Sequence, residues 1–147
     1  MVEIRIVKKR IEDLKAYENN PRKNGKAVNA VLESIKSFGF RNPIIVNREG
    51  VILAGHTRLE ALKKMGAVEV ECIELSHLSK EQEDAFRIAD NRVADFSFWD
   101  RDLLQKEMVE INADDWEKLG FNDKDLAFMK APEQCTCPKC GKTFIKV

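Results

Sequence analysis

The sequence lacks any long hydrophobic run, and none approaches the roughly 18 apolar residues that a membrane-spanning helix needs. Its first ten residues, Met-Val-Glu-Ile-Arg-Ile-Val-Lys-Lys-Arg, also lack the apolar stretch of a secretory signal. Internal repeats and low-complexity tracts are absent as well, so a repeat architecture is not expected. We therefore expect a cytoplasmic protein that has no membrane partner.

Cysteine is scarce, with four residues in a chain of 147. In a cytoplasmic protein, cysteines are more often free thiols or metal ligands than disulfides. Cys72 lies in an apolar segment and is predicted to be a small core residue. The other three, Cys135, Cys137 and Cys140, stand close together near the C-terminus and need a separate explanation.

The chain has no net charge, but its positive and negative residues are unevenly distributed along the sequence. Residues 1–64 hold 14 Lys and Arg against 7 Asp and Glu, whereas residues 65–147 hold 11 against 18. A basic front half is compatible with binding of nucleotide or nucleic acid. It is equally compatible with simple attraction between the two halves, because the sequence does not show which charges share a face.

The hydrophobic pattern predicts alternating short strands and helices. Strands are expected at 2–7, 44–46, 51–54 and 68–73, with a hairpin turn at 47–50. Helices are expected at 26–38, 57–65 and 80–92, along Leu103–Ile111, and over 119–129. This pattern indicates an α+β fold over residues 1–95, a helical extension over 96–130 and a Cys-containing tail over 131–147.

The junction at residues 55–58, Gly-His-Thr-Arg, joins a short apolar strand to a helix. The first N–H groups of a helix have no partner within the helix, and the helix dipole adds positive potential there. Gly55 would let a ligand approach, Thr57 could cap the helix, and Arg58 offers a planar set of donors. The turn is suited to hold phosphate. The alternative is an ordinary connection with a solvated Arg58 and His56.

The tail contains Cys137-x-x-Cys140 followed by Gly141, which is typical of one knuckle of a zinc ribbon. Zinc needs four ligands; Cys135 could be a third, and no fourth is evident in the tail. Two tails could share one metal ion in a homodimer. The alternative is a flexible tail with free thiols.

Four segments together resemble one known family. They occur in the order and spacing of that family and are Tyr17–Asn24 (with Asn-Asn-Pro-Arg), Ser37–Ile45 (Ser-Phe-Gly-Phe-Arg-Asn-Pro-Ile-Ile), Ala54–Ala61 (Ala-Gly-His-Thr-Arg-Leu-Glu-Ala) and Phe86–Ala94 (Phe-Arg-Ile-Ala-Asp-Asn-Arg-Val-Ala). The sequence resembles the ParB N-terminal-like domain, which shares its fold with sulfiredoxin. It looks most like the phage and mobile-element branch, whose members often precede a DNA methyltransferase domain.

The resemblance implies a ParB/sulfiredoxin-like mixed sheet with packed helices and a nucleotide pocket. Partition proteins of this family hydrolyse CTP to clamp on DNA, a related kinase phosphorylates free serine, sulfiredoxin uses ATP, and some members are described as nucleases. In the partition proteins the turn that matches Gly55–Arg58 cradles the triphosphate, together with the positions that match Asp90 and Asn91. The implied cofactor is therefore CTP or ATP with Mg²⁺.

Two departures from the family pattern limit which of the family's functions can be expected of this chain. Partition proteins usually carry Gly-Glu-Arg-Arg where this chain has Gly55-His56-Thr57-Arg58, so one carboxylate and one guanidinium are missing. Sulfiredoxin needs a catalytic cysteine in this turn, and the turn contains none. Sulfiredoxin activity is therefore not expected.

Phosphoryl chemistry needs cations on the phosphates, carboxylates that hold a metal ion and a group that orients the nucleophile. The candidates for catalysis are Glu18, His56 and Asp90, with His56 as a proton shuttle or a phosphate contact. The candidates for nucleotide binding are Arg22, Arg41, Gly55, His56, Thr57, Arg58, Asp90, Asn91 and Arg92; those for metal binding are Cys135, Cys137 and Cys140. Each could instead be structural: surface ion pairs for the outlying arginines, a helix cap for Asp90 and Asn91, and a solvated loop for Glu18.

Three functions are compatible with these residues and with the resemblance. The first is a ParB-like protein that binds CTP or ATP, acts with DNA and hydrolyses the nucleotide, with a DNA methyltransferase or another phage protein as a partner. The second is an enzyme that uses the same pocket, a DNase or a serine-type kinase. The third is a non-catalytic interaction module, which the missing Glu and Arg of the central turn would suit.

Overall fold

The computed structural model describes residues 4–18, 20, 25–94, 96–111, 116–122, 124–126, 134–136 and 143–145. Contacts divide the chain into two compact units, Met1–Trp99 and Asp100–Val147. The three-part division expected from the sequence stays a prediction.

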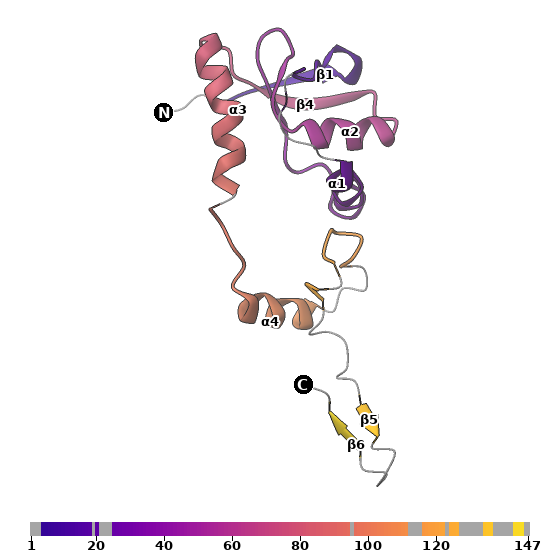
Figure 1. Cartoon of the computed structure of the whole chain (residues 1–147). Coiled ribbons are helices and arrows are strands. Elements are labelled where there is room, and N and C mark those ends of the chain that lie inside the picture. Colours follow the sequence, from indigo (N-terminus) through magenta and orange to yellow (C-terminus); the bar gives the residue numbers. More distant parts are fainter. Residues whose placement is uncertain are drawn as a thin grey trace. The chain divides into compact units, whose positions relative to one another are not determined.

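The first unit is built on a four-stranded mixed sheet (Figure 1). Its strands, β1 (Arg5–Arg10), β2 (Ile44–Val46), β3 (Ile52–Ala54) and β4 (Glu69–Glu74), lie in the order β1-β4-β2-β3. Strand β2 runs parallel to β4, whereas the β1–β4 and β2–β3 pairs are antiparallel. The predicted α+β class with a small mixed sheet is confirmed, as is the β2–β3 hairpin.

Three α-helices complete this unit: α1 (Gly25–Phe38), α2 (His56–Lys64) and α3 (Lys80–Ala94). A short 3₁₀ turn, η1 (Ile11–Asp13), follows β1. Each α-helix confirms a predicted segment within two residues at each end. Before α3, the Ser79 N–H donates to Gln82 Oε1 (2.9 Å) and the Gln82 N–H donates to Ser79 Oγ (3.3 Å), which is the reciprocal capping pattern that fixes a helix start.

The first strand covers residues 5–10, so the predicted strand at 2–7 is confirmed for residues 5–7 and wrong for residue 4, while residues 2 and 3 lie outside the described residues. Residues 8–10 are all basic and do not look like a strand in the sequence alone. Two of them pair with acidic residues of β4: Lys8 Nζ lies 2.7 Å from Glu69 and Lys9 Nζ lies 3.3 Å from Glu74. Pairing with β4, which the sequence does not reveal, therefore sets the position of β1.

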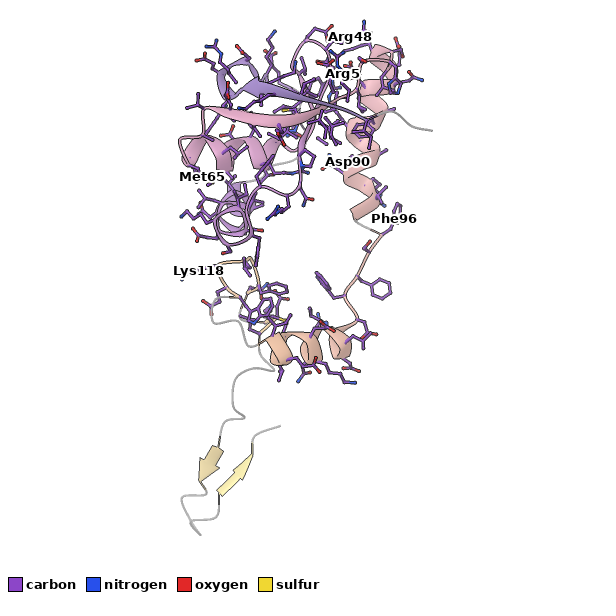
Figure 2. All side chains as sticks on the ribbon, turned by 180° about the vertical axis from the view of Figure 1, so that it is seen from behind. Arg5, Arg48, Met65, Asp90, Phe96 and Lys118 are labelled. Carbon is purple, nitrogen blue, oxygen red and sulfur yellow. The ribbon has the colours of Figure 1, made fainter. Side chains whose placement is uncertain are left out.

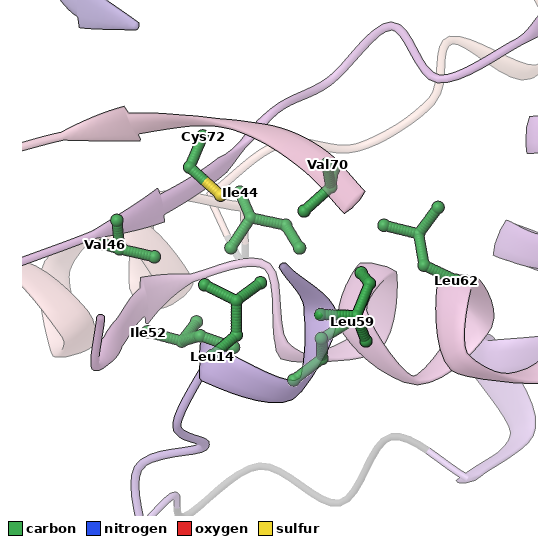
Figure 3. Packing of buried hydrophobic residues seen from close by; sticks show 9 residues of the cluster. Leu14, Ile44, Val46, Ile52, Leu59, Leu62, Val70 and Cys72 are labelled. Carbon is green, nitrogen blue, oxygen red and sulfur yellow. The ribbon is translucent and has the colours of Figure 1, made fainter. Parts of the chain in front are cut away.

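The core fills the space between the sheet and α2 (Figure 3). Ile44, Val46, Ile52 and Leu59 are fully buried, and Cys72 from β4 packs with them, as predicted for a small core residue. This core orients the end of β3 toward the start of α2. Among the described helices, none combines the length and the apolar composition that a bilayer crossing requires.

The second unit begins with α4 (Arg101–Ile111), which confirms the predicted Leu103–Ile111 pattern. Asp100 caps this helix, because its Oδ1 accepts the N–H groups of Asp102 and Leu103 at 3.1 Å. The helix predicted over 119–129 is wrong for residues 119–120 and 124–126, which form turns, and for residues 121–122, which have no regular structure; residues 123 and 127–129 lie outside the described residues. Gly120, at φ +102°, explains the break, because this conformation cannot continue a helix.

Near the C-terminus, β5 (Gln134–Thr136) pairs antiparallel with β6 (Thr143–Ile145), and Cys135 stands opposite Phe144 in the register. The sequence did not predict these strands. The predicted metal ligands Cys137 and Cys140, and the side chain of Cys135, lie outside the described residues.

Candidate functional site

A cavity of about 180 Å³ lies where β3 ends and α2 begins. One wall is the turn into α2 and the facing wall is the last part of α3, and Asn20 and Ala27 complete the lining. Figure 2 shows Asp90 on the side of α3 that faces α2. The lining residues are Asn20, Ala27, Ala54, Gly55, His56, Thr57, Asp90 and Asn91. The structure thus brings five predicted site residues, from positions 55–57 and 90–91, to one cavity.

Gly55 is the N-cap of α2 and has a left-handed backbone conformation, at φ +105° and ψ +25°. A Cβ added there would lie 3.4 Å from both Ile44 and the Arg58 guanidinium. The prediction that Thr57 caps the helix is wrong, because α2 already begins at His56 and no side chain caps it. The positive end of α2 therefore meets the cavity without a capping oxygen of its own.

His56 is half-buried, and its Nε2 accepts a hydrogen bond from the Tyr17 backbone N–H at 3.2 Å. Burial lowers the pKa of His56 below its ordinary value, and the positive charge of Arg87 lowers it further, against a smaller opposing effect of Glu60. The imidazole is therefore neutral at pH 7. The hydrogen bond requires the same state, since a protonated Nε2 could not accept it.

Arg58 is not among the residues that line the cavity. Its Nη1 donates to the carbonyl oxygens of Asn42 (3.2 Å) and Pro43, where the chain enters β2. Burial lowers the pKa of Arg58, and the Asp90 carboxylate opposes that shift, so the guanidinium and the carboxylate are electrostatically coupled across the α2–α3 gap. Arg58 therefore ties the first turn of α2 to the segment that enters β2.

The other predicted site residues that the structure describes are not among those that line the cavity. Arg41 donates its Nε to the Phe38 carbonyl (2.9 Å) at the end of α1. The guanidinium of Arg92 lies 4.9 Å from the Phe96 ring centroid. Glu18 lies in an exposed turn, and Arg22 falls outside the described residues. The predicted cluster of arginines on the phosphates is thus not assembled by the described residues.

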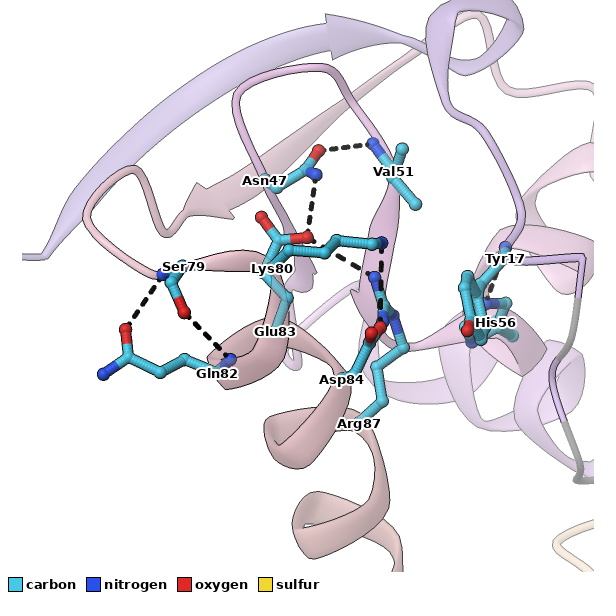
Figure 4. A network of polar contacts seen from close by, with 10 residues as sticks. All are labelled: Tyr17, Asn47, Val51, His56, Ser79, Lys80, Gln82, Glu83, Asp84 and Arg87. Atoms are coloured by element: carbon cyan, nitrogen blue, oxygen red, sulfur yellow. Dashed lines mark hydrogen bonds and ion pairs between the residues drawn. The ribbon is translucent and has the colours of Figure 1, made fainter.

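A buried polar network, which the sequence pattern did not predict, holds α3 in place (Figure 4). Glu83 and Arg87 are 7% and 6% exposed and form an ion pair with a Nη2–Oε2 distance of 3.5 Å. Asn47 of the hairpin turn donates to Glu83 Oε2 (3.1 Å) and accepts the N–H of Val51 (2.9 Å). The network therefore ties α3 to the β2–β3 hairpin.

Arg87 also connects α3 with the segment that follows η1. Its guanidinium carbon lies 4.0 Å from the centroid of the Tyr17 ring, and its Nη1 pairs with Asp84. One turn farther along α3, Asn91 Nδ2 donates to the Arg87 carbonyl (2.8 Å). In the sequence, Glu83 and Arg87 stand four residues apart, which is the spacing of an ion pair along a helix. Such pairs are usually exposed and weak, so this spacing could not indicate that the pair is buried.

Comparisons with known proteins find a matching family and a sequence relative. The model of the ParB N-terminal domain family matches residues 2–92. A ParB-like nuclease domain-containing protein of Escherichia coli K12, YnaK, is 36% identical over 80 residues, which cover 54% of this chain and 92% of that protein. The matched family region contains both walls of the cavity.

Solved structures are similar as well. The C-terminally truncated chromosome-partitioning protein ParB of Caulobacter crescentus, solved with CTP-γ-S, matches with a TM-score of 0.57 and 20% identity over 83% of this chain and 68% of that chain. Sulfiredoxin of Arabidopsis thaliana matches with a TM-score of 0.45 and 24% identity over 56% of this chain and 96% of that chain. The Caulobacter match supports the predicted fold.

Proposed function

Because the chain belongs to the ParB N-terminal domain family, we propose that its cavity binds the phosphates of a nucleoside triphosphate, CTP or ATP, together with Mg²⁺. The observation that carries the proposal is the uncapped start of α2 at Gly55, which opens into a cavity. Helix N-termini of this kind bind phosphate through their N–H groups and dipole. The fold relative from Caulobacter crescentus was solved with a CTP analogue, which supports the same class of ligand.

The size of the cavity is consistent with the phosphates alone. Its volume of about 180 Å³ falls below the roughly 300–1,000 Å³ that sites for whole small-molecule ligands occupy. The base and sugar would then lie outside this cavity. The choice between CTP and ATP therefore depends on groups beyond its two walls.

Asp90 is the acidic residue among those that line the cavity, and Asn91 stands beside it. Mg²⁺ prefers carboxylate, amide and phosphate oxygens, and usually takes one or two from the protein. These two side chains suit that ligand set. Bound Mg²⁺ would neutralise phosphate charge, a role for which the described lining residues offer no guanidinium.

A nucleotide panel tests this proposal. Titration calorimetry with CTP, ATP, GTP and UTP plus Mg²⁺ should show binding of at least one of them. Asp90→Asn should weaken it by about tenfold, the scale expected when one charge-assisted contact is lost. Asp102→Asn, which changes an exposed carboxylate on α4, serves as the matched control. Absence of binding by every nucleotide would refute the proposal and favour an interaction module.

A second candidate, a ParB-like DNase, is favoured by the name of the Escherichia coli relative. It would use the same Asp90 and Asn91 with Mg²⁺ on a DNA phosphate. Metal-dependent cutting of plasmid DNA without nucleotide would distinguish it from a nucleotide-binding protein that acts with DNA. A serine-type kinase is the other enzyme alternative, and phosphoryl transfer from ATP to serine would identify it. The nucleotide-binding proposal itself includes hydrolysis of the nucleotide, a DNA methyltransferase or other phage protein as partner, and a homodimer, each of which needs a separate assay.

We also propose that Cys135, Cys137 and Cys140 hold Zn²⁺, because the Cys-x-Cys-x-x-Cys spacing begins in one strand of a paired hairpin and ends before the other. Native mass spectrometry should then show bound zinc in the full chain, complete on one tail or shared by two. Cys137→Ser should release it, whereas Cys72→Ala, a change at a buried core thiol, should not. A metal-free wild-type protein would contradict the proposal.

A further inference from the structure

The two ring nitrogens of His56 have different surroundings. Nε2 accepts the Tyr17 N–H at 3.2 Å. A nitrogen that accepts a hydrogen bond carries no proton, so the proton of a neutral imidazole must lie on Nδ1. Since His56 lines the cavity, Nδ1–H is the donor that the ring can offer to a ligand there.

The backbone that donates to Nε2 is held by α3. The Tyr17 ring lies under the guanidinium of Arg87 at 4.0 Å, and the ammonium of Lys80 lies 5.6 Å from the same ring. Arg87 is in turn buried and paired with Glu83 and Asp84. The chain just before Tyr17 is also tied down, because the Lys15 N–H donates to the Gly50 carbonyl at 2.9 Å.

Charges around the ring favour the same neutral state. Arg87 from α3 disfavours the imidazolium form, and the N-terminus of α2, where His56 stands, does so as well. Glu60 from α2 acts in the opposite direction, but burial of the ring outweighs it. Burial and charge therefore favour the neutral ring, and the hydrogen bond from Tyr17 selects its Nδ1–H tautomer.

We propose that Tyr17 and Arg87 are positioning residues that hold His56 as the neutral Nδ1–H tautomer. The ring then gives the cavity one N–H donor without a positive charge. Such a donor suits a fully ionised phosphate oxygen, which only accepts hydrogen bonds. The role at the ligand rests on the proposed phosphate binding, whereas the tautomer itself can be measured in the free protein.

The tautomer is tested by long-range ¹H–¹⁵N correlation NMR of the full chain at pH 7. His56 should show a protonated Nδ1 and an unprotonated Nε2, and His77, the other histidine of the sequence, provides an assignment control. Tyr17→Phe keeps the ring under Arg87 and should preserve this pattern. Tyr17→Ala should shift His56 toward a tautomer mixture. An Nε2–H or charged His56 in the wild-type protein would overturn the proposal.

Binding of inorganic triphosphate with Mg²⁺ tests whether the two ring nitrogens have different roles, Nδ1 as donor to the ligand and Nε2 as acceptor of the Tyr17 N–H. His56→Gln keeps an acceptor near the Nε2 position but loses the Nδ1 donor, so triphosphate affinity should fall about tenfold with little loss of stability. His56→Asn keeps a donor near the Nδ1 position but loses the acceptor, so stability should fall more than affinity. Equal effects of the two variants would overturn the inference. If the wild-type protein binds no triphosphate, the proposed function fails, and the NMR result still decides the tautomer.

Discussion

Arg87→Met is expected to lower the free energy of unfolding by about 3–5 kcal/mol, the range for removal of one partner of a buried ion pair. The physical reason is the Glu83 carboxylate, which is 7% exposed and would lose its cation. Asn47 would remain as its hydrogen-bond donor, and one neutral amide does not compensate a buried charge. Urea unfolding followed by circular dichroism measures the change.

Two further variants identify the cause of that loss. Lys63→Met removes an exposed ion pair with Glu60 and should cost about 0–1 kcal/mol. Combining Arg87→Met with Glu83→Gln should recover part of the lost stability, because the orphaned charge is removed. A loss below about 1 kcal/mol for Arg87→Met would mean that the network does not anchor α3.

Gly55→Ala should impair both stability and ligand binding. At φ +105° a side chain is strained, and such strain costs about 1–3 kcal/mol. The new Cβ would lie at ordinary van der Waals distance, 3.4 Å, from Ile44 and the Arg58 guanidinium, so the strain lies in the backbone, and its relaxation would move the turn. Because the N–H groups at the start of α2 would move with the turn, nucleotide affinity should fall at least about tenfold, which corresponds to about 1.4 kcal/mol. Chemical unfolding and titration calorimetry measure the two losses.

Gly66→Ala is the control that distinguishes the effect of backbone strain from the effect of a changed site geometry. Gly66 also has a positive φ, +71°, but an added Cβ would meet no atom within 4 Å, and this glycine follows the far end of α2. We expect a stability loss like that of Gly55→Ala and unchanged nucleotide affinity. If Gly66→Ala weakened binding as much as Gly55→Ala, the affinity loss would reflect global stability, and the Gly55 turn would have no special role.

Much of the fold could be predicted because periodicity is a local signal. The helices α1, α2 and α3 follow from apolar residues on one face, and Ser79 with Gln82 marks the start of α3. The end of β1 and the strands β5 and β6 could not be predicted in this way. Their stability comes from pairing with distant or polar segments, which leaves no periodic apolar pattern.

For the site, the sequence determined which residue types stand at the start of α2 and near the end of α3, and the family resemblance brought them into one hypothesis. It did not distinguish the lining residues from Arg41, Arg92 and Glu18, because a charged side chain has the same sequence signal in a cavity and on a surface.

Only the tertiary structure decided that Gly55, not Thr57, is the N-cap residue of α2 and that Arg58 binds the carbonyl oxygens at the entry into β2. It also decided that Arg87 and Glu83 are buried. These outcomes depend on the approach of α3, the β2–β3 hairpin and the Tyr17 segment. Burial and partnership of a charge are set by residues that are distant in the chain, so local sequence carries no record of them.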